Sequence, residues 1–213
     1  TSIPTLENGI RPLATLDPWR QIATAPLNKK LAKLNRDRLV AHGQMGTAVP
    51  GGPDACALFC QLLLEYCPGA ILGKADISNA YNSMKRAFMA NVLLEEGLLE
   101  MLRLFLFYYV APTRYWMQNG VMVNELLATM GIAQGDSTGT NTYDIAFSLG
   151  ITKPAMLQAR TLLITAGLTP NPSDPDLPPA QRVLARDPLH IIGLHDDTTP
   201  YHTHSVAAYI IIR

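Results

Sequence analysis

The sequence is poor in charge, in cysteine and in aromatic residues. Of its 213 residues, 16% are charged, 7% are aromatic and three are cysteines, whereas 48% are hydrophobic. No run of about 18 apolar residues occurs, which argues against a transmembrane helix. The first residues lack a basic segment followed by an apolar stretch, which is the pattern of a secretory signal. We therefore expect no secretory signal. Because the chain opens at Thr1 without a methionine, we expect an excised piece of a longer protein.

The three cysteines predict buried free thiols rather than a zinc site. Cys56 and Cys60 share one face of an expected helix, Cys67 follows it, and no histidine clusters with them. A structural zinc ion needs about four ligands. Buried free thiols suit a reducing compartment. We therefore expect an intracellular location, nuclear or cytoplasmic.

The net charge is zero, but the charges are unevenly distributed. Residues 1–40 hold seven basic residues against three acidic ones, a surplus of four that the remaining residues cancel. A positive surface there would suit a phosphate backbone. The alternative is an ordinary solvated helix, because Lys29, Lys30, Lys33 and Arg36 lie at helical spacing.

Residues 73–82 follow an apolar approach and combine a carboxylate with small polar residues. This pattern predicts a buried strand that carries Asp76 at its carboxyl end, followed by a turn and a helix from about residue 83. A carboxylate at the end of a core strand is costly unless a positive group meets it. The simpler alternative is a helix N-cap formed by Asp76, Ser78 or Asn79.

A second apolar run, residues 189–194, is closely followed by Asp196 and Asp197. Aspartates suit a tight turn. If this run lay beside the strand before Asp76, three carboxylates would cluster and repel one another. Divalent cations with oxygen ligands relieve such repulsion, and two ions about 3.5–4 Å apart form the clamp for phosphoryl transfer. The sequence alone does not show that the two strands are neighbours.

Three glycines and several short polar residues fill residues 131–140. Such a loop lets the backbone approach a flat ligand closely. The alternative is an ordinary capped helix start, with Asp136, Ser137 or Thr138 as the cap.

Local patterns predict the remaining elements. We expect helices over residues 55–66, 83–96, 98–110, 140–149 and 153–167, with Asp54 capping the first of them. The dipeptide Asn119-Gly120 predicts a hairpin over residues 114–123. Short strands are expected at 10–14 and 207–212, and the prolines of residues 169–179 exclude regular structure there.

In this order, the stretches resemble the motifs of a reverse transcriptase, of the type found in retrotransposons without long terminal repeats and in group II introns. Residues 74–82 are similar to the first palm motif, and 131–139 to the Gln-Gly-Asp-Pro/Ser-x-Gly motif. Residues 194–197 stand where the family has an aromatic residue, a variable residue and two aspartates. Ile10-Arg11-Pro12-Leu13 resembles the fingers motif. The resemblance covers roughly residues 10 to 200.

The resemblance implies an RNA-directed DNA polymerase fragment that uses two Mg²⁺ or Mn²⁺ ions. Asp76 and Asp196 would bridge the ions, the carbonyl of Ile77 would add a ligand, and Asp197 would be the auxiliary carboxylate. The implied partners are an RNA template with a DNA primer, and deoxynucleoside triphosphates, without a membrane. The oligomeric state stays open.

The family pattern also assigns substrate contacts. Arg11 would reach the triphosphate of the incoming nucleotide. Tyr81 would pack under the sugar and exclude a 2′-hydroxyl, with a core tyrosine as the alternative. Gln134 and Gly135 would pack along the nucleotide and the template base.

The implied fold is α+β: a palm with helices on one face of a mostly antiparallel sheet, plus partial fingers. We expect partial fingers in residues 1–68 and the palm in 69–213, with a Pro-rich insertion at about 169–180 and no thumb. The sequence departs from the family at Ser137, Leu194 and His195, and Pro200 predicts an edge strand. Two alternatives remain open: an inactive polymerase relic that binds RNA or a protein partner, and a metal-independent structural domain.

Overall fold

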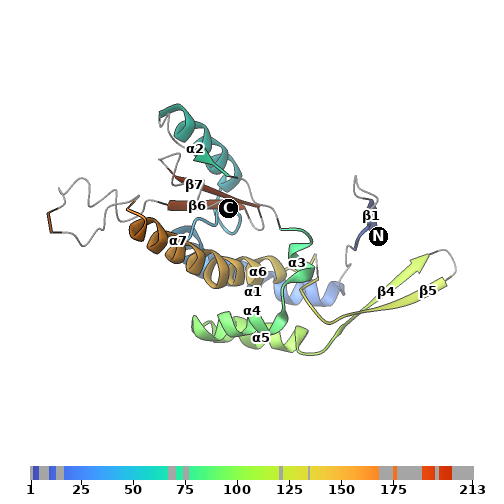
Figure 1. Ribbon diagram of the computed structural model, residues 1–213. Coiled ribbons are helices and arrows are strands. Elements are labelled where there is room, and N and C mark those ends of the chain that lie inside the picture. The colour runs from blue at the N-terminus through green and yellow to red at the C-terminus, as the bar shows by residue number, and fades with distance from the viewer. Residues whose placement is uncertain are drawn as a thin grey trace. The chain divides into compact units, whose positions relative to one another are not determined.

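The chain forms two compact units (Figure 1). Unit 1 combines Thr1–Asn35 with Ser78–Ala146, and unit 2 combines Arg36–Ile77 with Phe147–Arg213. The predicted division into fingers and palm stays a prediction. The structure, a computed structural model, describes residues 2–4, 10–12, 17–66, 71–73, 77–119, 122–133, 135–167, 175–176, 189–194 and 197–202.

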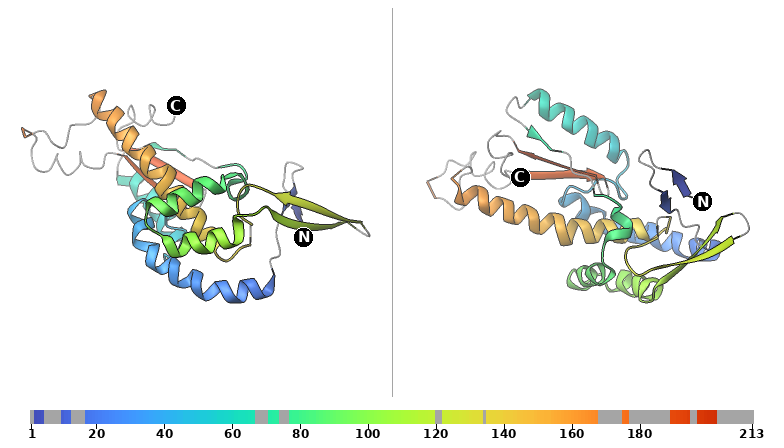
Figure 2. Two further views of the ribbon diagram at one scale, coloured as in Figure 1. Left: turned by 90° about the horizontal axis from the view of Figure 1, so that it is seen from below. Right: turned by 45° about the vertical axis from the view of Figure 1, so that its right-hand side comes forward.

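Helices build most of unit 1. Helix α1 (Pro18–Ala41) contributes its residues up to Asn35, and α3 (Ala80–Ser83), α4 (Arg86–Glu95), α5 (Leu99–Tyr109) and α6 (Gly139–Phe147) follow. Helices α4 and α5 lie side by side in both views of Figure 2. They are joined at Gly97, whose φ of 70° is one that glycine adopts readily. The predicted helix break at Gly97 is therefore confirmed.

The core of unit 1 is built from helix α6, which is buried almost all round, and from one face of α4 and of α5. Helices α4 and α5 bury Met89, Val92, Leu93, Met101, Phe105 and Tyr109. The predicted apolar stripe of α4 is confirmed at Val92 and Leu93, whereas Met84 and Phe88 are only half-buried. The stripe is shifted because Met84 precedes the helix, which begins at Arg86.

Helix α1 buries one side along the part that carries the basic residues. Leu31 and Asn35 are buried, one helical turn apart, and the Asn35 side-chain amide donates to the carbonyl of Leu31 at 2.9 Å. Lys29, Lys30 and Lys33 are exposed. Exposed lysines are what a solvated helix requires. A contact between these lysines and a phosphate backbone therefore stays a prediction.

Two antiparallel hairpins belong to unit 1. The predicted hairpin at 114–123 is confirmed as β4 (Thr113–Asn119) and β5 (Met122–Ala128), in which Asn119 pairs with Met122. It extends away from α4 and α5 (Figure 2). The other pairs β1 (Ser2–Pro4) with β2 (Ile10–Pro12).

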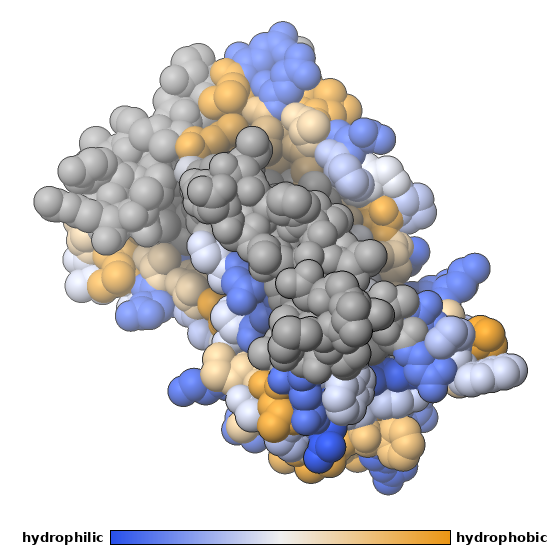
Figure 3. All heavy atoms as spheres, turned by 90° about the vertical axis from the view of Figure 1, so that its right-hand side faces the viewer, coloured by the Kyte–Doolittle hydropathy of each residue, from blue (hydrophilic) through white to orange (hydrophobic). Residues whose placement is uncertain are grey.

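The exposed hairpin face carries large apolar side chains. Trp116 is 68% exposed and Leu127 is 55% exposed. They share this face with Arg114 and Glu125, since side chains alternate along a strand and directly opposed residues lie on one side. Figure 3 shows hydrophobic residues at the surface among hydrophilic ones.

Unit 2 has an antiparallel sheet in the order β3-β7-β6, made of β3 (Ile71–Leu72), β7 (Asp197–His202) and β6 (Leu189–Leu194). Two helices contact β6: α2 (Gly52–Tyr66) and α7 (Lys153–Thr165). The π-helical turn η1 (Ser148–Thr152) directly precedes α7. Helices with antiparallel strands confirm the α+β class.

Two expectations for unit 2 are wrong. Helix α2 begins at Gly52, so Asp54 lies in its first turn and is not the cap residue. Pro200 lies in β7, the middle strand rather than an edge. In the described ladder, Pro200 pairs with Ile191 only, because the pairs between β3 and β7 end at Leu72 and Tyr201. A residue without an N–H is tolerated where no second strand pairs with it.

Several predictions fall outside the described residues. They concern Cys67, His195, the strand at 207–212 and most of the Pro-rich segment. Cys56 and Cys60 are free thiols, as predicted, but only Cys56 is buried, whereas Cys60 is half-buried. Within the described ranges, no helix has both the length and the apolar character needed to cross a bilayer.

We expect the Cys56 thiol to react slowly with alkylating reagents in the folded protein. Burial, and secondarily the neighbouring Cys60, raise its pKa above the ordinary value of 9.0, which lowers the reactive thiolate fraction. The measurement is iodoacetamide labelling at pH 8, followed by fragment mass spectrometry. In the native protein, Cys60 should be modified before Cys56. In urea at about 8 M, which unfolds the protein, the two thiols should be modified at similar rates. Equal native rates would contradict the expectation.

Candidate functional site

The loop between β5 and α6 begins against the segment that carries Tyr81. The N–H of Gly131 donates to the carbonyl of Met84 at 2.9 Å, and the N–H of Ile132 donates to the carbonyl of Tyr81 at 2.8 Å. Gly131 has a φ of 66°, and a Cβ there would lie 2.4 Å from both the Cα of Asn82 and the carbonyl oxygen of Tyr81. Only glycine allows this approach. Two of the motif segments are therefore joined through their backbones.

The Tyr81 side chain rests on a second aromatic ring. Its ring centroid lies 4.6 Å from that of Tyr143, at an interplanar angle of 34°. Tyr143 of α6 is buried, whereas Tyr81 is half-buried. The core tyrosine of this pair is thus Tyr143, and Tyr81 keeps an accessible part.

Asp136 is the most enclosed carboxylate of this loop, with a side chain that is 0% exposed. One oxygen, Oδ2, accepts from Arg20 Nη2 and from the Tyr109 hydroxyl, each at 2.5 Å. The other oxygen, Oδ1, accepts from the N–H and the hydroxyl of Thr138, both at 2.9 Å. Helix α6 begins at Gly139, so Thr138, not Asp136, directly precedes it. Among the three candidate cap residues, the position before the helix therefore belongs to Thr138, and Asp136 holds Thr138 in place.

Arg20 reaches Asp136 from the first turn of α1, across 116 residues of sequence. Its guanidinium carbon lies 3.7 Å from the centroid of the Tyr108 ring. Within the described part of the chain, its buried Nε has no hydrogen-bond partner. The ion pair and the ring together hold a largely buried cation in place.

The Tyr109 hydroxyl makes two bonds in opposite senses. It donates to Asp136 and accepts from the N–H of Ala133 at 3.1 Å. Burial raises the pKa of Tyr109 well above its ordinary value, and the charge of Asp136 raises it further. The phenol therefore stays protonated and keeps its role as donor.

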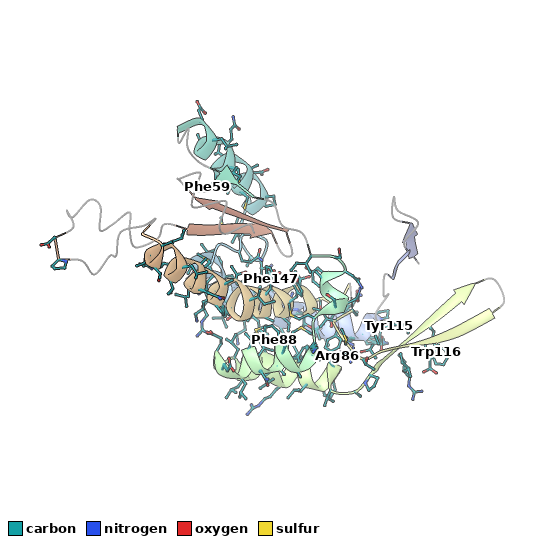
Figure 4. The ribbon with its side chains drawn as sticks, viewed as in Figure 1. Phe59, Arg86, Phe88, Tyr115, Trp116 and Phe147 are labelled. Atoms are coloured by element: carbon teal, nitrogen blue, oxygen red, sulfur yellow. The ribbon has the colours of Figure 1, made fainter. Side chains whose placement is uncertain are left out.

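Arg86 ties the other side of the loop to α5 and β4. Its Nε donates to the carbonyl of Gly131 at 2.8 Å, its Nη1 to Ala111 at 2.8 Å, and its Nη2 to the Thr113 hydroxyl at 2.9 Å. These acceptors are neutral, and burial lowers the pKa of Arg86. Figure 4 shows Arg86 where the β4–β5 hairpin leaves the helices.

The predicted site residues divide between described and undescribed positions. Asp76, Gln134 and Asp196 lie outside the described residues. Gly135 is exposed, with a φ of 109°, and directly follows position 134. Tyr81 and the loop on either side of positions 134 and 135 are brought together in unit 1. Their roles toward a substrate stay predictions.

The remaining predicted residues lie on other elements. Arg11 is in β2, opposite Ile3. Ile77 is half-buried, and Asp197 begins β7, paired with Leu194. The described residues contain no group of three or more histidine, cysteine or acidic residues that could hold a metal ion. For Asn79, the N-cap position of α3 is confirmed, but its side chain makes no capping bond.

In unit 2, the structure decides a question that the sequence leaves open. Strand β3 pairs with β7 through Ile71↔His202 and Leu72↔Tyr201. The strand that precedes Asp76 is therefore a direct neighbour of the hairpin that carries Asp197. The run at residues 189–194, which is β6, does not itself lie beside β3, because β7 lies between them. The expected adjacency is therefore met only by the second strand of the hairpin.

The sequence did not identify Arg20, Tyr109 or Arg86 as parts of the site. In the sequence, Arg20 was noted only as one of the basic residues that give positions 1–40 their positive charge. The available signal was Asp136 itself, because a buried carboxylate requires a positive or donating partner. Nothing local indicated which residue would supply it.

Comparisons with protein-family models and with curated proteins found no match. Among solved structures, the chain is similar to telomerase from Candida albicans, in complex with the TWJ fragment of telomeric RNA. The TM-score is 0.43 at 11% identity, over 91% of this chain and 32% of that chain. The chain thus spans about a third of that telomerase. The likeness is weak and carries no assignment of activity.

Replacing Gly131 by alanine should destabilise unit 1 much more than the same change at Gly97. Both residues have a positive φ, which costs roughly 1–2 kcal/mol for alanine. A Cβ at Gly97 meets nothing within 4 Å, whereas at Gly131 it meets backbone atoms at 2.4 Å. Urea denaturation of the two variants measures the difference. Equal losses in the free energy of unfolding would contradict the close approach.

The raised pKa of Tyr109 predicts a loss of stability in alkali. Unfolded Tyr109 releases its proton near pH 10, whereas the folded protein retains it above that pH. The folded state then binds more protons, so the free energy of unfolding falls as pH rises, by up to about 1.4 kcal/mol per pH unit. Urea denaturation between pH 9 and 11 should show a steeper fall for the wild type than for Tyr109→Phe. Parallel slopes would exclude Tyr109 as the source.

Proposed function

We propose that the chain is the fingers and palm part of an RNA-directed DNA polymerase of the reverse-transcriptase type, acting by two-metal nucleotidyl transfer. The four motifs in order suggest this function. The pairing of β3 with β7 is the observation that carries it, because this long-range contact brings the strand before position 76 beside the strand that begins at Asp197.

The direction of this pairing supports a carboxylate cluster. Each step toward the carboxyl end of β3 moves one step back along β7, from Ile71↔His202 to Leu72↔Tyr201, where the described pairs end. Because the two strands are antiparallel, the carboxyl end of β3 and Asp197, the first residue of β7, lie toward the same end of the sheet. Asp76, Asp196 and Asp197 would then meet at that end.

Such a set of residues fits two Mg²⁺ or Mn²⁺ ions, because carboxylate oxygens are the ligands these ions prefer. Asp76 and Asp196 would bridge the ions, the Ile77 carbonyl would add a ligand, and Asp197 would be the auxiliary carboxylate. Once bound, the ions would activate the 3′-oxygen of the primer and neutralise the triphosphate.

Other residues of the chain would position the substrates. Arg11 would hold the triphosphate, since a planar guanidinium forms paired hydrogen bonds with phosphate oxygens. Tyr81, supported by Tyr143 from below, would pack under the deoxyribose. Gln134 and Gly135 would lie along the nucleotide and the template base. Positioning and electrostatic stabilisation would supply most of the catalysis.

Primer extension on an RNA template with Mg²⁺ or Mn²⁺ tests the function. We expect the wild type to extend the primer, and Asp76→Asn and Asp196→Asn to lose activity by at least about a hundredfold. Asp37→Asn is the matched control, because this side chain is 84% exposed in a surface ion pair, which contributes little. The control should extend like the wild type.

The opposite outcome has a definite meaning. If neither this chain nor one lengthened at both ends extends a primer, the polymerase proposal is wrong, and the inactive relic becomes the better interpretation. If the two aspartate variants stay active, the two-metal assignment is wrong even though the chain is a polymerase.

Replacing Tyr81 by alanine should admit ribonucleotides. The ring occupies the space that a 2′-hydroxyl would need, so its removal should raise the ratio of ribonucleotide to deoxynucleotide use by about tenfold or more. Tyr81→Phe keeps the ring and should keep the selectivity. Single-nucleotide extension with each triphosphate measures the ratio. A ratio that is equal in the two variants would rule out this role for Tyr81.

A further inference from the structure

We infer that Arg20 and Tyr109 are positioning residues: together with Asp136 they form a frame that fixes the loop segment 134–135 for substrate contact. This inference rests on the proposed function, which assigns substrate contact to Gln134 and Gly135. The frame itself is a feature of unit 1 and is made of residues that the sequence motifs do not include.

The frame forms hydrogen bonds to the residues on both sides of the segment. The Tyr109 hydroxyl accepts from the N–H of Ala133, which immediately precedes the segment, and donates to Asp136, which immediately follows it. The hydroxyl oxygen of Tyr109 is therefore hydrogen-bonded to the residues on both sides of the segment. Residues 133 and 136 are also joined directly, because the N–H of Asp136 donates to the carbonyl of Ala133 at 3.0 Å.

Solvent exposure differs sharply among Ala133, Gly135 and Asp136. Ala133 is 2% exposed and Asp136 is 4% exposed, whereas Gly135 between them is exposed. Gly135 has a φ of 109°, a conformation that L side chains rarely adopt. Gly135 is thus exposed at the surface between two residues that are themselves in the core. A short segment with buried anchors on both sides has little freedom to shift.

Arg20 makes the frame dependent on α1. A fully buried carboxylate is unfavourable without a cation, and removing one partner of a buried ion pair leaves an uncompensated charge. Arg20 supplies the cation at 2.5 Å, and the Tyr108 ring covers its guanidinium. The position of the loop is therefore set by a residue that lies 116 positions away in the sequence.

The functional consequence follows from the geometry of positioning. A displacement of about 1 Å in a group that positions a substrate can lower the rate about a hundredfold. Loosening the frame should weaken the contact with the incoming nucleotide while leaving the carboxylates of unit 2 unchanged. The predicted effect therefore lies in the KM for deoxynucleotides and not in the metal dependence.

The test compares Tyr109→Phe with Thr24→Val. Tyr109→Phe removes the hydroxyl that binds both flanks but leaves the ion pair intact. Thr24→Val removes a similarly buried hydroxyl, which donates to the backbone carbonyl of Arg20 at 2.7 Å and contacts the Ser137 hydroxyl at 2.5 Å. Neither bond is one of those that join Tyr109 to Ala133 and Asp136. We expect Tyr109→Phe to raise the deoxynucleotide KM about tenfold, with the Mg²⁺ dependence unchanged, and Thr24→Val to keep the wild-type KM.

Hydrogen exchange supplies a readout that does not require activity. In Tyr109→Phe, the amide of Ala133 should exchange about ten times faster, because its acceptor is gone, while the amide of Leu98 in the α4–α5 turn should keep its rate. Arg20→Lys should retain more of the nucleotide affinity than Arg20→Gln, because it keeps the positive charge.

Each outcome has a separate meaning. If Ala133 keeps its protection in Tyr109→Phe, the frame does not hold the segment and the inference is wrong. If Tyr109→Phe and Thr24→Val raise KM equally, the effect is general destabilisation, and the inference is again overturned. If the wild type extends no primer while exchange at Ala133 responds as expected, the proposed function fails and the role of the frame in polymerisation fails with it, leaving the frame as a purely structural device.

Discussion

The buried charge of Asp136 is the constraint on which unit 1 depends. A carboxylate with no solvent exposure needs partners for both oxygens. Arg20 of α1 and Tyr109 of α5 provide them on one side, and Thr138 provides them on the other. The start of α1, the end of α5 and the start of α6 must therefore meet at one point. Because removing any partner would leave a buried group unsatisfied, these contacts specify one arrangement of the helices.

The same loop shows that a structural role and a proposed functional role can coexist. Asp136 accepts from the N–H of Thr138, the residue directly before α6. At the opposite end, Gly131 contacts the backbone of Asn82 too closely for any side chain, and Arg86 binds its carbonyl. Between these anchors, Gly135 is exposed. The bonds at both ends thus hold in place a residue that would be available to a ligand.

Unit 2 depends on a different constraint, the register of a short strand. The two residues of β3 pair with His202 and Tyr201 of β7, and the described pairs end there. A shift by one residue would turn every side chain to the other face of the sheet. The proposed carboxylate cluster therefore depends on two backbone pairings as much as on the aspartates themselves. Pro200 is compatible with this sheet because the described pairs with β3 end before it.

Local patterns predicted the elements whose signals span a few residues. The break at Gly97, the hairpin of β4 and β5 and a helix start close after Asp136 were predictable, because turn chemistry and periodicity act over a few residues. The pairing of β3 with β7, the central place of Pro200 and the bond from Arg20 to Asp136 were not predictable from local patterns. Each of these depends on which distant segments pack together, and many basic residues could have met Asp136. Only the tertiary structure decides that choice, since it must satisfy burial, charge and backbone hydrogen bonding at the same time.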